Sequence, residues 1–374
     1  MISKHEFLVI GGGMAGASVA AHLAEHASVR LLEMEDQPGY HSTGRSAAVF
    51  AQTYGNATVR ALTRASRPFF YEPPPGFSSV PLVKPRDVLV ITHRQQGEVL
   101  EAFIASIAPG DHFERKSVGE ALELCPILKP DELTGAVLSR SPADIEVHEL
   151  HQGYLRLLKS RNGIVTTAAR VMGLERTSDA WRVTTGQETL HARTVINAAG
   201  AWAGEIASLA GARPIGLQPL KRTVCLIESP VGRRADQWPL VLEAEEQFYI
   251  KPDAGMLLIS AAEETLSQPC DAQPDELDIA IAVDRVERAT SLQVKRIGRR
   301  WAGLRSFVKD RSPVIGYDPL QPGFFWLAAL GGYGIQTAPA LSRLAASLAL
   351  QLPVEEELLA CGIELQALAP NRHL

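Results

Sequence analysis

The sequence has few of the residues that mark several common protein classes. Its four cysteines lie far apart, without the spacing of a metal site or a redox pair, so we expect free thiols and no metal. Basic residues number 37 against 42 acidic ones, and the net charge of -5 argues against a nucleic-acid partner. No apolar run is long enough to span a bilayer. Because Met1 to Glu6 lead directly into an apolar run, we expect no signal peptide and a location in the cytoplasm or at the inner face of the membrane.

A glycine-rich turn between two apolar runs is the most informative local pattern. The run 7–10 stops at Gly11, glycines recur at Gly13 and Gly16, and a second apolar run ends at Glu33, about 20 residues after the first glycine. In this fingerprint the first glycine makes a tight turn, the second admits a pyrophosphate, and the third lets helix and strand pack closely. The helix N-terminus attracts phosphates. The pattern predicts a dinucleotide-binding unit in which Glu33 accepts the ribose hydroxyls.

A second strand–glycine–helix junction lies near the other end of the chain. Residues 324–330 have the pattern of a buried strand, and Gly331 to Thr337 lead into a helix that extends to about Leu350. An NAD enzyme usually keeps its nucleotide contacts in one contiguous block. Two distant junctions suit a longer cofactor, which favours FAD.

The length predicts two domains, because 374 residues exceed what one core usually holds. We expect an α/β fold with a discontinuous, Rossmann-like FAD-binding domain formed by residues 1–50, 145–215 and 300–374. Residues 51–144 and 216–299 are expected to form a mostly antiparallel-sheet α+β domain that binds the substrate.

Local signals place several further elements. Ser117 and Glu120 form a capping box that opens a helix ending before Pro126. Helical periodicity covers 149–159, and a charged helical stretch covers 275–295. Strands are predicted at 164–167, 181–185, 194–197, 223–227, 248–251 and 256–260.

Five long segments carry a resemblance that goes beyond the fingerprint. They are residues 37–48, 217–219, 249–258, 301–307 and 331–337. Through them the whole chain resembles flavin-dependent amino acid oxidoreductases of the D-amino acid oxidase type, and among these the bacterial D-arginine dehydrogenases most. The sarcosine-type oxidases attach their flavin covalently through a cysteine that is missing near Arg305 here, so the resemblance implies non-covalent FAD.

The resemblance also implies which residues touch the cofactor. They belong to the fingerprint turn, the segment that follows the second strand, the adenine side and the second junction. The implied residues are Gly11, Gly13, Met14, Ala15, Gly16, Glu33, Met34, Ser42, Thr43, Gly44, Arg45, Ser46, Ala47, Ala48, Val171, Ala199, Gly200, Trp202, Gly303, Gly331, Gly332, Tyr333, Gly334, Ile335, Gln336 and Thr337.

An amino acid substrate needs its carboxylate fixed, and a planar guanidinium does this with two parallel hydrogen bonds. Arg305 lies where the family keeps that residue, with Arg222 and the Tyr249 hydroxyl as helpers. Tyr54 matches a tyrosine on a loop over the pocket, and the Gly332 carbonyl is expected to accept from the substrate amine. Orientation then dominates the reaction, in which hydride leaves Cα for flavin N5 and water converts the imine to a 2-oxo acid and ammonia. No histidine is needed as a base.

Three positions depart from the D-arginine enzymes. Val49, Ala51 and Val88 replace a histidine, a threonine and the glutamate that pairs with the substrate's cationic side chain. A buried cation without a partner is costly, so we predict D-amino acid substrates with apolar or small side chains. Asp87 would restore an acid only if the register of its strand slipped by one residue, since adjacent strand residues face opposite sides.

The sequence constrains the electron acceptor less than it constrains the substrate. Sarcosine-type oxidases place a lysine near the flavin in the strand that here spans 256–260, and none occurs there, which favours a dehydrogenase passing electrons to a quinone or a carrier. The alternatives are an oxidase of glycine, sarcosine or another N-methyl amino acid that forms hydrogen peroxide, a dehydrogenase using NAD alone, and a flavoprotein without amino acid turnover.

Overall fold

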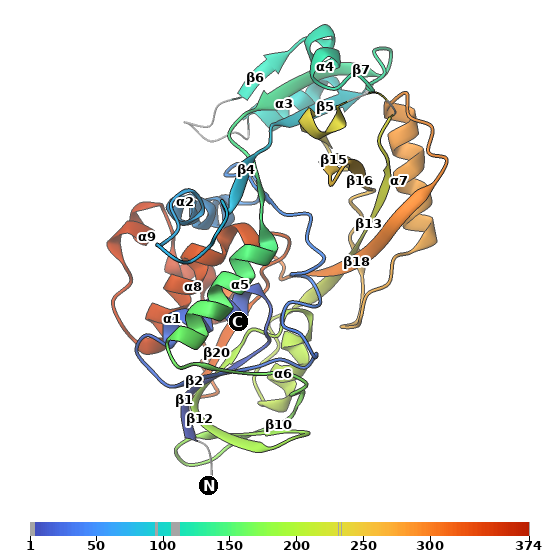
Figure 1. The fold of residues 1–374 in the computed structure, drawn as a ribbon. Helices are drawn as coiled ribbons and strands as arrows, with labels where there is room; N and C mark the ends of the chain where they lie inside the picture. The colour runs from blue at the N-terminus through green and yellow to red at the C-terminus, as the bar shows by residue number, and fades with distance from the viewer. Residues whose placement is uncertain (1–3, 94–95, 106–112, 231, 233, 374) are drawn as a thin grey trace.

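The computed structural model describes residues 4–93, 96–105, 113–230, 232 and 234–373. Figure 1 shows two bodies, one around β1, α1 and α8 and the other around β5, β7 and α7, connected by the long strands β13 and β18. The second of these bodies contains a large sheet of its own, and a small third sheet lies with the first body.

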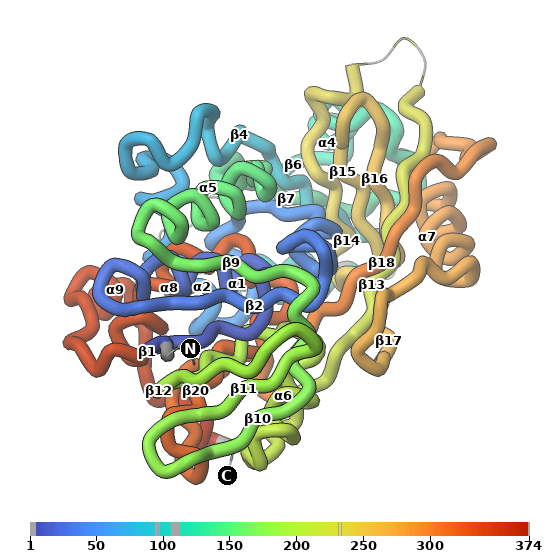
Figure 2. The backbone as a smooth tube through the Cα atoms, turned by 60° about the horizontal axis from the view of Figure 1, so that its bottom comes forward, coloured from blue at the N-terminus to red at the C-terminus, as the bar shows by residue number. Residues whose placement is uncertain are grey.

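The first sheet is mixed and carries the predicted fingerprint. Its order is β10 (Val171–Arg176), β11 (Trp181–Thr185), β12 (Thr189–Asn197), β1 (Lys4–Ile10), β2 (Val29–Leu32) and β9 (Ile164–Thr166). The first half of β12 pairs with β11, and its second half pairs in parallel with β20 (Phe324–Ala328), which continues to β19 (Val314–Tyr317). Figure 2 shows β20 beside β12 although about 130 residues separate them in the chain. The beginning, middle and end of the chain therefore meet in one sheet.

Helices cover both faces of this sheet. They are α1 (Met14–Leu23), α2 (Ala57–Tyr71), α5 (Val147–Ser160), α8 (Gly334–Leu350) and α9 (Glu356–Ala360) on one side and α6 (Ala203–Leu209), preceded by the 3-10 turn η1 (Gly200–Trp202), on the other. The neighbours Leu8 and Val9 are both fully buried, but they belong to the cores on opposite faces. This double coverage explains why the strand reads as a continuous apolar run.

The second sheet is mostly antiparallel. Its order is β17 (Thr265–Leu266), β13 (Gln218–Glu228), β16 (Met256–Ser260), β15 (Tyr249–Asp253), β14 (Leu240–Glu243), β5 (Val88–His93), β7 (Leu133–Ser139) and β6 (Phe113–Lys116), with β18 (Ile297–Phe307) on the other edge of β13. The neighbouring helices are α3 (Gly97–Ala105), α4 (Val118–Leu124) and α7 (Glu276–Ala289). The predicted capping box is present at Ser117. The small third sheet has the order β3 (Val49–Phe50), β8 (Ala143–Ile145) and β4 (Val83–Pro85).

The two faces of the second sheet serve different purposes. Leu89 and Ile91 of β5 point into a core that α4 and α7 complete, whereas the alternate residues Val88 and Val90 face a cavity. The period of two along a strand produces this division. The sheet is thereby anchored on one face and free to contact a ligand with the other.

Helix α2 differs from the predicted arrangement. The predicted boundaries place residues 51–144 in the substrate domain, but Leu62 and Phe70 of α2 are buried in the core of the first sheet together with α8. Its apolar side chains fall on one helical face, and α8 supplies the surface that buries this face. The segment 88–139 does join the second sheet, and β18 passes from that sheet to the first body.

A buried ion cluster joins the small sheet to the second one. The Asp144 carboxylate on β8 lies 2.8 Å from Arg86 Nε and 3.0 Å from Lys251 Nζ. The Lys251 side chain on β15 is only 8% exposed, so the carboxylate is the counter-charge that makes its burial tolerable.

We therefore predict that D144A destabilises the protein. Removing the carboxylate leaves Lys251 buried without its partner, which should lower the free energy of unfolding by about 3 kcal/mol. Urea denaturation would measure the loss. The control is D284A, which removes the partner of Arg288 in an exposed pair and should cost less than about 1 kcal/mol. Equal effects of the two substitutions would contradict a special role for the cluster.

Candidate active site

One cavity of about 1100 Å³ extends from the β1–α1 junction to the inner face of the second sheet. Nearly all the predicted cofactor and substrate residues line it, including the fingerprint turn, 45–48, the turn 199–202, the second junction and the predicted substrate-binding side chains. The predicted residues that do not line it are Gly16, Gly44 and Thr337. The cavity is therefore shared by both bodies of the molecule, as a cofactor and a substrate that meet would require.

The three residues outside the lining have structural positions instead. A Cβ on Gly16 would lie 1.8 Å from the Gly11 carbonyl oxygen, so this glycine permits the close helix packing that the fingerprint predicts. Gly44 donates its N–H to the Gly39 carbonyl at 2.8 Å and shapes the turn beside the cavity. Thr337 is buried within α8, where its hydroxyl donates to the Tyr333 carbonyl at 2.9 Å. These residues support the lining without belonging to it.

The fingerprint turn is held open by its neighbours. Gly11 has φ +107°, and a Cβ there would lie 2.4 Å from the Ala198 carbonyl oxygen, so only glycine fits. The Glu33 carboxylate accepts the Gly12 N–H at 2.8 Å, and burial raises the pKa of Glu33. The Thr43 hydroxyl accepts the Met14 N–H at 2.9 Å, which ties the following segment to the start of α1.

His151 was missed as a contributor to this turn. It is buried on α5, and its Nε2 lies 2.8 Å from the Gly12 carbonyl oxygen. Burial lowers the pKa of His151, so a neutral ring that donates from Nε2 is favoured. The expectation for His151 was a helix-surface or hydrogen-bonded histidine that does not act as a base. Its position in a helix gave no indication that the ring supports the loop 139 residues earlier in the chain.

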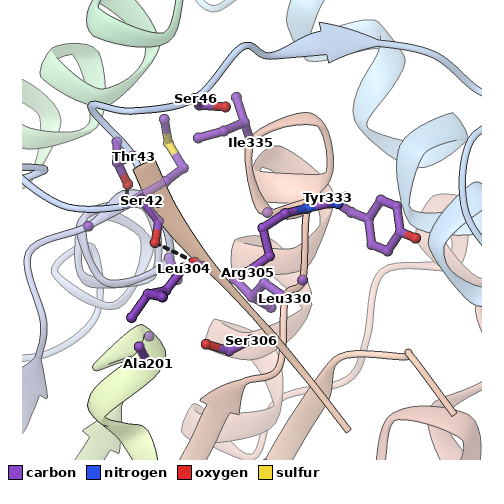
Figure 3. Close-up of a pocket in the computed structure, with 18 of the residues that line it drawn as sticks. Ser42, Thr43, Ser46, Ala201, Leu304, Arg305, Ser306, Leu330, Tyr333 and Ile335 are labelled. Carbon is purple, nitrogen blue, oxygen red and sulfur yellow. Dashed lines mark hydrogen bonds between the residues drawn. The ribbon is translucent and has the colours of Figure 1, made fainter. Parts of the chain in front are cut away.

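Several lining groups fit a long polar cofactor such as FAD. The Ser42 hydroxyl donates to the Leu304 carbonyl at 2.6 Å and fixes the segment 42–48 along β18 (Figure 3). The buried Ser306 hydroxyl and the Gln336 Nε2 group have no protein partner. Buried polar groups are rarely left unpaired, so these atoms indicate a ligand that supplies partners. Together with the glycine turn at α1 and the N-terminus of α8, they match the residues that FAD would need.

Arg305 lies at the meeting point of the two bodies. Figure 3 shows its side chain extending from β18 toward the turn before α8, and a Cβ on Gly332 would lie 1.8 Å from its Nη2 atom. That Nη2 donates to the Tyr54 hydroxyl at 3.1 Å, whereas the buried Nη1 makes no hydrogen bond to protein. A guanidinium keeps its proton, so this N–H group can donate a hydrogen bond to an anionic group of a ligand.

Arg222 and Tyr249 lie in the same cavity, on β13 and β15. Arg222 is held by the carbonyl oxygens of Ala262, at 2.7 Å from Nη2, and Glu263, at 3.1 Å from Nε. Burial raises the pKa of Tyr249, so its hydroxyl remains a hydrogen-bond donor. The structure thus brings all five predicted substrate-binding residues to one region of the cavity.

Much of the remaining lining beside the second sheet is apolar, and Ser139 and Glu246 are polar residues that also line it. Val49, Ala51 and Val88 line the cavity as predicted. Further apolar lining residues that the sequence did not reveal are Val90, Phe103, Phe113, Val224, Leu240 and Leu242. The period of two along β5 and β14 could have identified Val90, Leu240 and Leu242 once one residue of each strand had been placed.

Asp87 does not enter the cavity. Its carboxylate pairs with Arg140 Nη1 at 2.9 Å, on the opposite side from Val88. The strand register pairs Val88 with Leu240 and with Ser139, so the slip that would bring an acid into the pocket does not occur. The part of the chain that the structure describes has no cluster of three or more histidine, cysteine, aspartate or glutamate side chains suited to a metal ion. None of its helices combines the length and hydropathy needed to cross a bilayer.

Comparison with known proteins gives some relatives that match less than half of the chain and others that match nearly all of it. The hydrogen cyanide synthase subunit HcnC of Pseudomonas aeruginosa is 31% identical over 177 residues, which cover 46% of this chain and 39% of that protein. The FAD-dependent oxidoreductase domain-containing protein 1 of Bos taurus is 27% identical over 173 residues, 42% of this chain and 35% of that protein. These two matches therefore span little more than a third of those relatives. Glycine oxidase of Bacillus licheniformis is 23% identical over 96% of both chains.

The fold is shared with solved flavoenzymes. The crystal structure of glycine oxidase from Geobacillus kaustophilus matches with a TM-score of 0.83 at 20% identity, covering 100% of both chains. L-proline dehydrogenase from P. horikoshii matches with a TM-score of 0.80 at 23% identity over 95% of this chain and 96% of that one. The model of the family of FAD dependent oxidoreductases matches residues 6–348. The expected α/β fold and FAD are thereby confirmed, and the chain belongs to the FAD-dependent oxidoreductase family.

Proposed function

We propose that this protein oxidatively deaminates D-amino acids with apolar or small side chains to 2-oxo acids and ammonia, acting as a dehydrogenase. The supporting observation is the position of Arg305. Its Nη1 makes no hydrogen bond to protein, and Arg305 lines a cavity whose lining beside the second sheet is largely apolar, so one end of the site suits a carboxylate and the other a hydrocarbon side chain. The family relatives that act on amino acids, such as glycine oxidase, support the same substrate class.

The residues of the chain orient the substrate. Arg305 binds the carboxylate, and Arg222 and Tyr249 donate to it from the adjoining strands. Tyr54 holds the guanidinium through its hydroxyl and closes the loop side of the site. The Gly332 carbonyl accepts from the amine, so that the neutral amine and Cα–H are fixed together. Orientation of this kind supplies much of the catalytic effect.

Bound FAD would supply the acceptor for the hydride that leaves Cα. The chain itself then has to admit water to the imine and release the 2-oxo acid. The strand β16 carries no lysine, which supports a dehydrogenase over an oxidase of the sarcosine type. The electron acceptor would then be a quinone or a protein carrier.

An oxidase of glycine, sarcosine or another N-methyl amino acid is the second candidate. The similarity to glycine oxidases over 96% of the chain favours it. Against it, the wall formed by Val90, Leu240 and Leu242 offers more apolar surface than a substrate without a side chain can fill. Rapid peroxide formation from glycine or sarcosine in air would select this candidate.

The deciding experiment is anaerobic bleaching of the flavin by a panel of D- and L-amino acids. We expect D-leucine, D-methionine and D-phenylalanine to reduce the flavin rapidly, and their L-enantiomers and D-arginine to do so slowly. A clear preference for D-arginine, or no bleaching by any amino acid, would contradict the proposal.

Replacement of Arg305 tests the carboxylate clamp, by which we mean Arg305 with its helpers Arg222 and Tyr249. Because R305M removes two charge-assisted hydrogen bonds, kcat/KM for D-leucine should fall by roughly 100- to 1000-fold. Steady-state kinetics with the FAD-loaded enzyme would measure it. The matched control is R300M on the same strand, which removes an exposed pair with Glu276 and should leave kcat/KM near the wild-type value. Unaltered kinetics in R305M would exclude the clamp.

Replacement of Val88 tests the side-chain pocket. V88E places a carboxylate where β5 faces the cavity, so the ratio of kcat/KM for D-arginine to that for D-leucine should rise at least about tenfold. The control is D87A, whose carboxylate pairs with Arg140 outside the cavity and should not affect this ratio. A ratio that responds to D87A and not to V88E would show that the strand faces the other way in solution.

A further inference from the structure

The Glu264 carboxylate is shared by three guanidinium groups at the end of the site where Arg305 lies. Glu264 Oε1 lies 2.7 Å from Arg311 Nη2 and 3.5 Å from both Arg222 Nη2 and Arg305 Nη1. Its other oxygen accepts from Arg311 Nη1 at 3.0 Å. Neither Glu264 nor Arg311 is part of the predicted clamp, and the segments that carry them are 40 or more residues from Arg222 or each other along the chain. The group that is to bind a ligand's carboxylate therefore already has a carboxylate beside it.

Glu264 is held in this position from two sides. Arg222 binds the carbonyl oxygens of Ala262 and Glu263, and Ala262 adopts φ +53°, so the backbone before Glu264 is fixed in a tight bend. Arg311 donates a hydrogen bond to each oxygen of the Glu264 carboxylate, and its Cζ atom lies 3.8 Å from the centroid of the Phe307 ring. The Glu264 side chain is 31% exposed, too little for a freely moving surface group. An ion pair that is bidentate and partly buried, as this one is, is of the kind that persists.

The charge state of this carboxylate is also set by its neighbours. Burial favours the neutral acid, but the Arg311 fork and the charges of Arg305 and Arg222 outweigh it and lower the pKa of Glu264. Glu264 is thus an anion at neutral pH. Arg305 Nη1 makes no hydrogen bond, so Glu264 compensates its charge without using the donor that a ligand needs.

We propose that Glu264 is an internal counter-ion that limits how tightly the clamp binds carboxylates. This inference rests on the proposed function, in which substrate and 2-oxo acid product carry the same carboxylate. Without Glu264, three guanidinium groups would face the ligand with no opposing charge, and the product would be retained. Its negative charge repels the ligand's carboxylate and weakens both complexes, so it acts through Arg222 and Arg305 as a positioning and affinity-setting residue.

The test measures binding of 3-methylbutanoate and of its uncharged amide, 3-methylbutanamide, to the FAD-loaded enzyme. Calorimetry and the shift of the flavin absorbance would both report it. In E264Q the dissociation constant of the carboxylate should fall about fivefold, because a nearby like charge is removed from a partly exposed site. That of the amide should be unchanged. In E264D, which keeps the charge, both should remain near the wild-type values.

The control variant is E355Q, which removes the forked partner of Arg343 away from the cavity and should alter neither ligand. Unchanged or weaker carboxylate binding in E264Q, or an equal change for carboxylate and amide, would overturn the inference. A merely structural role would shift both ligands together. The proposed function fails by a different observation, the absence of flavin bleaching by D-amino acids, so the two ideas can be contradicted separately.

Discussion

The buried guanidinium of Arg305 is the constraint on which the rest of the site depends. Arginine does not lose its proton, so a buried one must be surrounded by groups that accept its hydrogen bonds or balance its charge. The Tyr54 hydroxyl and Glu264 provide part of this, and Gly332 is a glycine because the guanidinium occupies the space of a side chain. Its Nη1 makes no hydrogen bond to protein, and Glu264 lies 3.5 Å from it. The glycine junction before α8 and the loop at residues 51–56 thus both serve the same charged group.

The second sheet shows how one element can provide stability and recognition together. Leu89 and Ile91 anchor β5 in a core, while Val88 and Val90 line the cavity. A shift of one residue would exchange these roles, so the hydrophobic core enforces the register that keeps Asp87 out of the site. The selectivity that we propose for apolar side chains therefore depends on packing on the far face of the sheet.

Local patterns predicted many elements well and failed where burial depends on distant partners. The strands at 181–185 and 256–260 and the capping box at Ser117 are present as predicted. The charged helix expected at 275–295 ends at Ala289, because Thr290 pairs with Leu128 in an isolated bridge. Helix α2 was not predicted at all. Its apolar face becomes informative only when α8 lies against it.

The sequence by itself determined the cofactor turn, because glycine spacing and strand–helix junctions are local and each has a direct steric or electrostatic cause. Its resemblance to the family predicted the residues of the carboxylate clamp. Only the tertiary structure decided what surrounds the clamp. Glu264 and Arg311 reach Arg305 through the pairing of β13 with β18 and through a bend at Ala262. Charge pairing acts through space and requires no fixed spacing along the chain, so no sequence pattern could have shown it.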